Sequence, residues 1–282
     1  MMKVQRRNFR IQTLILNLVA LVMLMTTAAT HAQRLPGTEN GEWRYLGGDA
    51  GHTRYSPLDQ INAGNFGELE EVWAWRSDNF GPNLDYFSRA TPIYVDGMLY
   101  SVATPRRQVI AMDPATGENL WTFRETPTIR HSRSPRQAYG KGVAYAEVNG
   151  RGVIYITTPG FFLWALDAKT GLPLENWGSA VPLEGFGDSG VVDLIPHLVE
   201  DWGPWQDYVI AGGSYDPNYG IPRELGMVTA SAPPIVVNGV VVVLVGHQPS
   251  YGQTRIENVP GDIMGFSAET GEFMWKFHSI PR

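Results

Sequence analysis

The sequence has no cysteine among its 282 residues. This excludes disulfide bonds, a lipid anchor on an N-terminal cysteine and a covalently attached c-type haem in this chain. Charged residues are also sparse, at 18% of the chain against about 25% in an average domain. Stability must therefore come from burial and from hydrogen bonds between strands.

Positive charge is scarce once the first residues are set aside. Residues 1–32 hold four of the 22 Lys and Arg residues and no acidic residue, so the remainder carries 18 basic and 28 acidic residues, a net charge of −10. Because phosphate binding needs a basic surface, we expect no nucleic-acid partner.

Only one long, mainly apolar run occurs, from Ile11 to Met25. A basic head precedes it and small residues follow it up to Ala32, an order typical of a secretory signal peptide that is cleaved after residue 32. We therefore expect an exported, periplasmic protein. An uncleaved membrane anchor is the alternative, although the run is short for one. The pair Arg6-Arg7 weakly resembles a twin-arginine export signal.

What the sequence does contain is glycine, proline and aromatic residues, with 31 Gly, 20 Pro, 9 Trp and 12 Tyr. This composition favours many turns and strands. A pattern of strand, turn closed by Thr-Gly, and aromatic strand begins at residue 109 and recurs at residues 165 and 265. The turns close with glycine because a hairpin with a G1-type bulge needs one residue at positive φ. These glycines are Gly117, Gly171 and Gly271.

A tryptophan follows each repeated turn. Trp121 and Trp275 stand four residues after their glycines, whereas Trp177 stands six residues after its glycine, where we expect looser docking. An isolated hairpin cannot bury its own apolar face, so repeated hairpins with a large aromatic residue predict stacked, similar units.

Upstream hairpins complete the units. Segments 91–102 and 232–244 each read as two short strands joined by Asp-Gly or Asn-Gly, the preferred two-residue turns. Two hairpins make a four-stranded antiparallel blade, and the sequence predicts an all-β fold, a partial β-propeller of about three blades. We place these blades at about 88–125, 139–177 and 229–278 of a domain spanning 33–282. Three unrelated hairpins in a sandwich are the alternative.

Two further segments surround the blades. Residues 69–75 carry two tryptophans and are interpreted as a lone outer strand of a closing blade. The spacing between turn glycines grows from 54 to 100 residues around 178–228, so this range holds either a degenerate blade or an insertion. Turn residues without paired apolar strands favour the insertion.

The loop from Thr126 to Arg136 is basic, with four cationic or titratable side chains. A solvated basic loop and an anion-binding rim are both open interpretations.

Several motifs together resemble the quinoprotein dehydrogenases that use pyrroloquinoline quinone (PQQ). They are the Asp-x-x-Thr-Gly repeat with its tryptophan, the opening motif Gly-Gly-Asp-x-x-x-x-Arg-Tyr-Ser-Pro-Leu-x-Gln-Ile-Asn at 47–62, the segment Gly-Val-Ala-Tyr at 142–145, and Glu-Asn-Val-Pro-Gly-Asp at 257–262. The glucose dehydrogenase branch is the most similar. The resemblance implies an eight-bladed propeller, a bound Ca²⁺ ion, and oxidation of a sugar or alcohol in the periplasm. It also implies a quinone or cytochrome acceptor, and membrane association through that acceptor.

The resemblance also implies contacts to the cofactor and the metal. Pro135-Arg136 stands where alcohol-oxidising relatives carry adjacent cysteines, so Arg136, with Arg133 beside it, is expected to meet a PQQ carboxylate. Gln137 aligns with a histidine of the glucose-type relatives. Glu257 lies within about a residue of the family's metal-ligating glutamate and is the expected Ca²⁺ ligand, with His247 and Asp262 as weaker candidates in the same loop region.

The stacking tryptophan and the general base of the family pattern lie beyond Arg282. We therefore assign no catalytic residue and expect the chain to be an N-terminal part of the enzyme, inactive alone. Open blade faces would favour association with other chains. A non-catalytic propeller scaffold of the outer-membrane assembly type is the alternative function.

Overall fold

The computed structural model describes residues 36–80, 88–104, 106–138, 140–245 and 259–280. Contacts divide the chain into Met1–Pro36 and Gly37–Arg282. The predicted signal peptide, 1–32, falls in the first unit and lies outside the described residues. In the described part, no helix has the length and apolar character that a membrane crossing requires.

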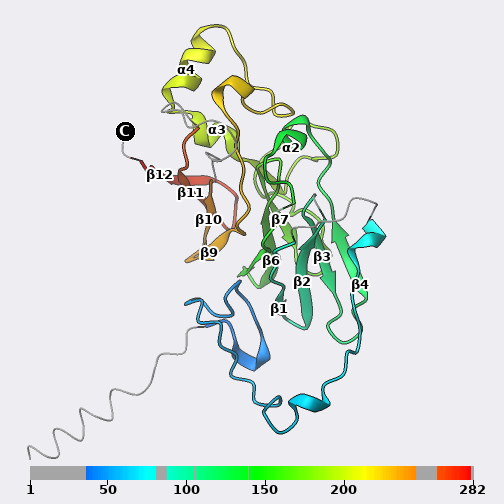
Figure 1. Ribbon diagram of the computed structural model, residues 1–282. Helices are drawn as coiled ribbons and strands as arrows, with labels where there is room; N and C mark the ends of the chain where they lie inside the picture. The colour runs from blue at the N-terminus through cyan, green and yellow to red at the C-terminus, as the bar shows by residue number, and fades with distance from the viewer. Residues whose placement is uncertain (1–35, 81–87, 105, 139, 246–258, 281–282) are drawn as a thin grey trace, which may run out of the picture. The chain divides into compact units, whose positions relative to one another are not determined.

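The second unit contains three four-stranded sheets, each with its strands antiparallel and in sequence order (Figure 1). Blade 1 consists of β1 (Ile93–Val95), β2 (Met98–Ala103), β3 (Gln108–Met112) and β4 (Asn119–Phe123). Blade 2 consists of β5 (Ala144–Val148), β6 (Arg151–Thr157), β7 (Phe162–Asp167) and β8 (Val191–Asp193). Blade 3 consists of β9 (Ile235–Val237), β10 (Val240–Leu244), β11 (Ile263–Ser267) and β12 (Phe273–Phe277). The all-β partial propeller predicted from the sequence is confirmed.

The first hairpin of each blade closes with two residues at positive φ. Asp96 and Gly97 have φ of 49° and 77°, and Asn238 and Gly239 have φ of 48° and 76°. This is the type I′ turn, whose twist matches that of the flanking strands. The Asn149-Gly150 turn of blade 2 is built the same way, with φ of 51° and 74°.

The tryptophans join consecutive blades. The indole nitrogen of Trp73 donates to the carbonyl of Pro114 at 3.1 Å, that of Trp121 to Ala168 at 3.0 Å, and that of Trp177 to Ala268 at 3.0 Å. The three accepting carbonyls occupy the same position of the repeated turn, three residues before its glycine. Each indole therefore docks on the turn of the blade that follows it. Trp177 makes the same bond as Trp121, so the looser docking expected there was wrong.

Apolar cores fill the spaces between blades. One cluster joins blades 1 and 2 through side chains such as Ile93 and Trp164, and a second joins blades 2 and 3 through side chains such as Tyr155 and Phe266. All four side chains are at most 1% exposed. Blade 2 is thus buried on both faces, which explains why every residue of β7 is buried.

Two sequence predictions need correction. Residues 69–75, predicted as a lone outer strand, form no strand, although Trp73 and Trp75 pack against blade 1, with the Trp75 indole donating to Asn119 Oδ1 at 3.0 Å. The outer strand of blade 2 is β8, which lies inside the range assigned to an insertion. The segment directly after the second Thr-Gly turn forms no strand: it makes the isolated bridge Leu166–Pro173, and the Leu174 amide donates to the Ala165 carbonyl at 2.9 Å. Proline cannot donate to a strand ladder, and the pairing is taken over by β8.

The rest of 178–228 is an insertion that carries two helices, α3 (Leu194–Val199) and α4 (Gly203–Ile210). The predicted basic loop contains the short helix α2 (Ile129–Arg133). Four 3₁₀ turns complete the described structure: η1 (Glu39–Gly41), η2 (Phe66–Glu68), η3 (Ser77–Phe80) and η4 (Arg223–Leu225).

Candidate functional site

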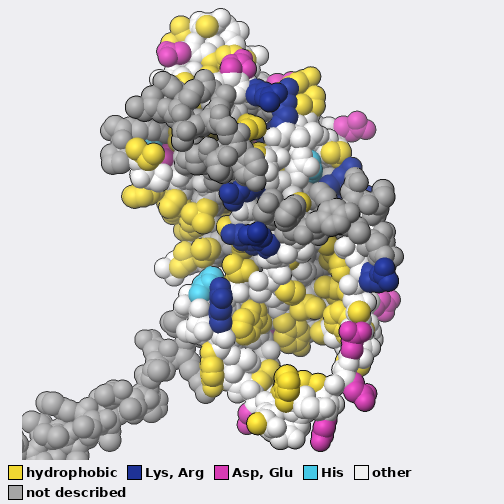
Figure 2. Space-filling view, in the orientation of Figure 1, with side chains coloured by type: hydrophobic (Ala, Val, Ile, Leu, Met, Phe, Trp, Pro, Cys, Tyr) yellow, Lys and Arg dark blue, Asp and Glu magenta, His cyan; other side chains and the backbone are white. Residues whose placement is uncertain are grey.

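Because the strands of each blade are antiparallel, alternate connections between strands lie at one edge of the blades. The two-residue hairpins and the Thr-Gly turns lie at the opposite edge. The connections β2–β3 and β6–β7 and the linkers 124–143 and 194–234 therefore share the edge where α2, α3 and α4 lie (Figure 1). In Figure 2, Lys and Arg side chains occur at the centre of the face shown, while Asp and Glu lie towards its margins.

Helix α2 is fixed at both ends by side chains. Thr128 caps its first turn, its hydroxyl accepting from the His131 amide at 3.1 Å. The Gln137 amide donates to the carbonyls of His131 and Ser132 at 3.0 and 2.8 Å, which satisfies the last turn. Gln137 therefore holds the carboxyl end of α2.

Arg130 anchors α2 to blade 2 and to the insertion. Its guanidinium donates to both carboxylate oxygens of Asp193 at 2.9 and 3.1 Å, to the Tyr215 hydroxyl at 2.7 Å and to the Phe161 carbonyl at 3.2 Å. It also lies over the Phe162 ring, 3.4 Å from its centroid. The side chain is only 5% exposed, so this pair is a buried, multiply bonded ion pair.

A second group, the buried polar cluster, consists of the buried side chains of Arg107, His131 and Thr157 and the backbone carbonyl of the half-buried Arg136. The Arg107 guanidinium donates to the carbonyls of Thr157, at 3.2 Å, and Arg136. Burial, assisted by the charges of Arg106 and Arg107, lowers the pKa of His131 to about 4, so its imidazole is neutral at pH 7. Among the described residues, His131 Nδ1 and Thr157 Oγ1 have no hydrogen-bond partner.

Glu125 lies fully buried between blades 1 and 2. One carboxyl oxygen accepts from the Thr158 hydroxyl at 2.6 Å and the Trp164 indole at 2.7 Å, while the other has no partner in the described part of the chain. Burial raises the pKa of Glu125 to about 7, against the opposing effect of these hydrogen bonds. Gly160 permits the approach of this carboxyl group, because a Cβ there would lie 2.9 Å from Glu125 Oε1.

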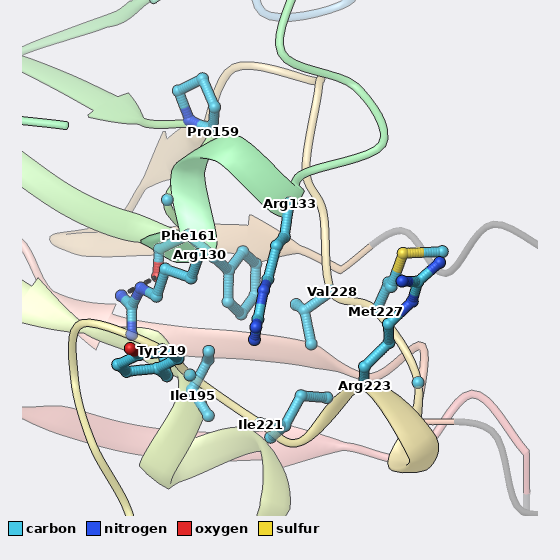
Figure 3. Close-up of a pocket in the computed structure, with 13 residues that line it drawn as sticks. Arg130, Arg133, Pro159, Phe161, Ile195, Tyr219, Ile221, Arg223, Met227 and Val228 are labelled. Atoms are coloured by element: carbon cyan, nitrogen blue, oxygen red, sulfur yellow. Dashed lines mark hydrogen bonds between the residues drawn. The ribbon is translucent and has the colours of Figure 1, made fainter. Parts of the chain in front are cut away.

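A cavity of about 310 Å³ opens between α2, the β6–β7 connection, α3 and residues 219–228 (Figure 3). Its buried walls are apolar, and exposed side chains, including two arginines, line its mouth. The buried apolar side chains are Phe161, Ile195, Ile221 and Val228. The exposed side chains are Arg133, Tyr219, Arg223 and Met227.

The predicted cofactor residues fall in three different surroundings. Arg133 lines the cavity, Arg136 belongs to the buried polar cluster, and Gln137 binds the end of α2. The predicted metal ligand Glu257 lies outside the described residues, as does His247. Asp262 is buried, and its carboxylate accepts a hydrogen bond from His278 Nδ1 at 2.9 Å. Among the described residues, no group of three His, Asp or Glu side chains is arranged to hold a metal ion.

Arg107, His131 and Glu125 did not emerge from the sequence. His131 was noted only as part of a basic loop, and Glu125 stands between polar neighbours with no periodic pattern to indicate burial. Nothing in the sequence around Glu125 indicates that a neighbouring blade buries this side chain.

Three four-stranded blades that dock on one another through tryptophans define a β-propeller, and comparisons with known proteins give its family. The family model described as the PQQ glucose/ethanol/alcohol dehydrogenase β-propeller domain matches residues 43–282. The chain belongs to this family of PQQ-dependent dehydrogenases.

Individual relatives include sugar and alcohol dehydrogenases. The chain is 30% identical over 253 residues to the glycerol dehydrogenase large subunit of Gluconobacter thailandicus, covering 86% of this chain and 29% of that protein. It is 27% identical over 266 residues to quinoprotein glucose dehydrogenase A of Acinetobacter calcoaceticus, covering 87% and 29%. The chain thus spans less than a third of the length of these relatives.

A solved structure shows the same blade arrangement. The quinohemoprotein alcohol dehydrogenase ADHIIG of Pseudomonas putida superposes with a TM-score of 0.58 at 28% identity, over 86% of this chain and 27% of that chain. These matches do not favour the scaffold alternative.

Proposed function

We propose that this chain is part of a periplasmic PQQ-dependent dehydrogenase that oxidises a sugar or an alcohol and passes electrons to a quinone or a cytochrome. The observation that carries the proposal is the family match across residues 43–282. Export to the periplasm rests on the signal-peptide pattern of residues 1–32. The relatives include both sugar and alcohol dehydrogenases, so the glucose-type branch also remains part of the proposal.

The buried polar cluster fits the chemistry of PQQ, an aromatic tricarboxylate. Arg106, Arg107 and Arg136 supply positive charge, and carboxylates pair well with guanidinium groups. The partnerless His131 Nδ1 and Thr157 Oγ1 are polar atoms whose burial favours a bound polar ligand over an empty space. When bound, the quinone would accept the electrons and hydrogen removed from the alcohol carbon.

Within this proposal the residues of the chain bind and orient. Arg136 is the proposed contact to a cofactor carboxylate, and Arg107 fixes the backbone at that position by donating to its carbonyl. His131 is held neutral by burial, so it adds no positive charge beside the arginines. Gln137 keeps α2 in place, and we propose that Arg133 faces a different ligand.

A Ca²⁺ ion is proposed as the partner of the quinone, with Glu257 as its ligand. Ca²⁺ prefers hard oxygen ligands and would polarise a quinone carbonyl as a Lewis acid. Glu257→Gln should therefore reduce the increase in PQQ affinity that Ca²⁺ produces.

The experiment is a titration of the chain with PQQ, with and without Ca²⁺, followed by tryptophan fluorescence. We expect Arg136→Gln to weaken PQQ binding about tenfold or more, since a charge-assisted hydrogen bond contributes about 1.5–3 kcal/mol. Arg124→Gln is the matched control, because the exposed Arg124 bonds to Gln108 instead. Unchanged binding in Arg136→Gln would remove this residue from the site.

Activity is tested on the full-length gene product with PQQ, Ca²⁺ and a dye acceptor. Dye reduction with a sugar or alcohol supports the proposal, whereas its absence with every substrate of both classes rejects the dehydrogenase function.

A further inference from the structure

The cavity beside α2 has no part in the proposed cofactor chemistry. It is separate from the buried polar cluster in composition, because none of Arg107, His131, Arg136 and Thr157 lines it. Its volume of about 310 Å³ lies at the lower end of small-molecule sites.

The mouth of the cavity carries positive charge from two exposed arginines. In the described part of the chain, neither Arg133 nor Arg223 has a salt-bridge partner. No acidic residue is among the lining residues. Arg130 also lines the cavity, but Asp193 already neutralises it. Two guanidinium groups are therefore available to a ligand.

The arginines come from different elements and face one cavity. Arg133 extends from α2 between Phe161 and Val228, and Arg223 comes from η4 beside Met227 (Figure 3). The Arg133 guanidinium lies 5.3 Å from the centroid of the Tyr219 ring, which steadies it by a cation–π contact.

The interior selects for an apolar body. Phe161, Ile195, Ile221 and Val228 are between 1% and 9% exposed. An inorganic anion would leave these walls in contact with water, and a neutral apolar molecule would leave the two cations without a partner. A molecule with an apolar body and one negative end satisfies both.

Hydrogen bonds hold the walls of the cavity in place before any ligand binds. Asn218 accepts from the backbone amides of α2, through Oδ1 to Ile129 at 3.0 Å and through its carbonyl to Arg130 at 2.9 Å. The turn that bears Tyr219 is thereby tied to the helix that bears Arg133. A site formed before binding loses little conformational entropy when it is filled.

We propose that this cavity binds an organic carboxylate, with the carboxylate held by Arg133 and Arg223 and the apolar body against Phe161, Ile195 and Val228. The proposal is independent of the dehydrogenase function. It applies equally to a substrate that carries a carboxylate and to an acidic effector, which share this chemistry.

The test is calorimetric titration of the chain with benzoate and cyclohexanecarboxylate as probes. We expect both to bind, and benzamide and inorganic phosphate to bind at least tenfold more weakly. Arg133→Gln and Arg223→Gln should each weaken benzoate binding about tenfold, with Arg124→Gln unchanged. Both target side chains are exposed, so the substitutions should leave the fold intact, which circular dichroism verifies.

Any of these calorimetric outcomes overturns the proposal: no binding of either probe, equal binding of benzamide and benzoate, equal binding of phosphate, or unchanged affinity in both arginine variants. A PQQ titration of the same protein separates the two sites. If PQQ displaces benzoate and loses affinity in Arg133→Gln, the cavity belongs to the cofactor and the proposal is wrong. If benzoate binds while the full-length product reduces no dye with any sugar or alcohol, the cavity stands and the proposed function falls. Dye reduction by the full-length product, inhibited or supported by the carboxylate, distinguishes an effector from a substrate.

Discussion

Replacing Gly171 by alanine tests the docking of one blade on the next. Gly171 has φ of +71°, and a Cβ there would overlap the indole of Trp121. Two penalties therefore add: alanine at positive φ, and displacement of an indole that donates to Ala168 at 3.0 Å. Gly97→Ala is the matched control, because its φ is +77° and nothing lies within 4 Å of its Cβ position.

The expected magnitudes separate the two variants. The backbone penalty is roughly 1–2 kcal/mol for a left-handed alanine. Overpacking a filled site adds about 1–3 kcal/mol. Gly97→Ala should therefore lower the free energy of unfolding by about 1–2 kcal/mol, and Gly171→Ala by about 2–5 kcal/mol.

The assay is urea unfolding followed by far-ultraviolet circular dichroism, repeated in a Trp121→Leu background. Removing the indole should abolish the extra cost of Gly171→Ala and leave only the backbone penalty, giving a coupling energy of about 1–3 kcal/mol. Equal costs for Gly97→Ala and Gly171→Ala in the wild-type background would refute the docking argument, as would a cost for Gly171→Ala that does not depend on the indole.

Three further predictions concern buried charge and exposed surface. Glu125 has its pKa raised by burial to about 7, so its destabilising effect is absent below its ordinary pKa of 4.5 and fully developed above about pH 7. At about 1.4 kcal/mol per pKa unit, the Glu125→Gln variant should be more stable than the wild type by about 3 kcal/mol at pH 8 and equally stable near pH 4. Urea unfolding at each pH measures the difference, and a difference that does not change with pH would contradict the prediction. Arg130→Leu should cost about 3–5 kcal/mol because it leaves the Asp193 carboxylate buried without its cation, whereas Arg130→Leu with Asp193→Leu should recover much of that loss in the same assay. Phe277 is 60% exposed and Trp275 38% exposed on blade 3, so light scattering should detect association of the isolated chain, reduced by Phe277→Ser; a stable monomer at all concentrations would oppose this.

Much of the fold could be predicted from the spacing of turn residues and tryptophans in the sequence. Local turn chemistry at Asp96-Gly97 and Asn238-Gly239 and the repeated Thr-Gly turns determine the hairpins, and these were predicted correctly. Strand β8 was not predicted, because a long connection that includes Pro173 separates it from its partner β7 in the sequence. Pairing across such a gap depends on tertiary packing, which no local pattern records.

Less of the candidate site than of the fold could be predicted from the sequence. Four titratable residues in one loop suggested a basic rim, but their separate roles come from folding. Arg130 pairs with Asp193, which is 63 residues away, and Gln137 turns back to the end of its own helix. The burial of Glu125 depends on Thr158 and Trp164 of the next blade. Such contacts between distant segments determine which charges remain available to ligands.

The direction of the indole contacts has a consequence for synthesis. Trp73, Trp121 and Trp177 each dock on a turn glycine that lies 44, 50 or 94 residues later in the chain. At roughly 5–20 residues per second, the turn for Trp121 is made roughly 3–10 s after the indole itself. During translation, each of these indoles therefore stays uncovered until the next blade is made. The packing between blades is then completed in order, from the amino end of the chain onward.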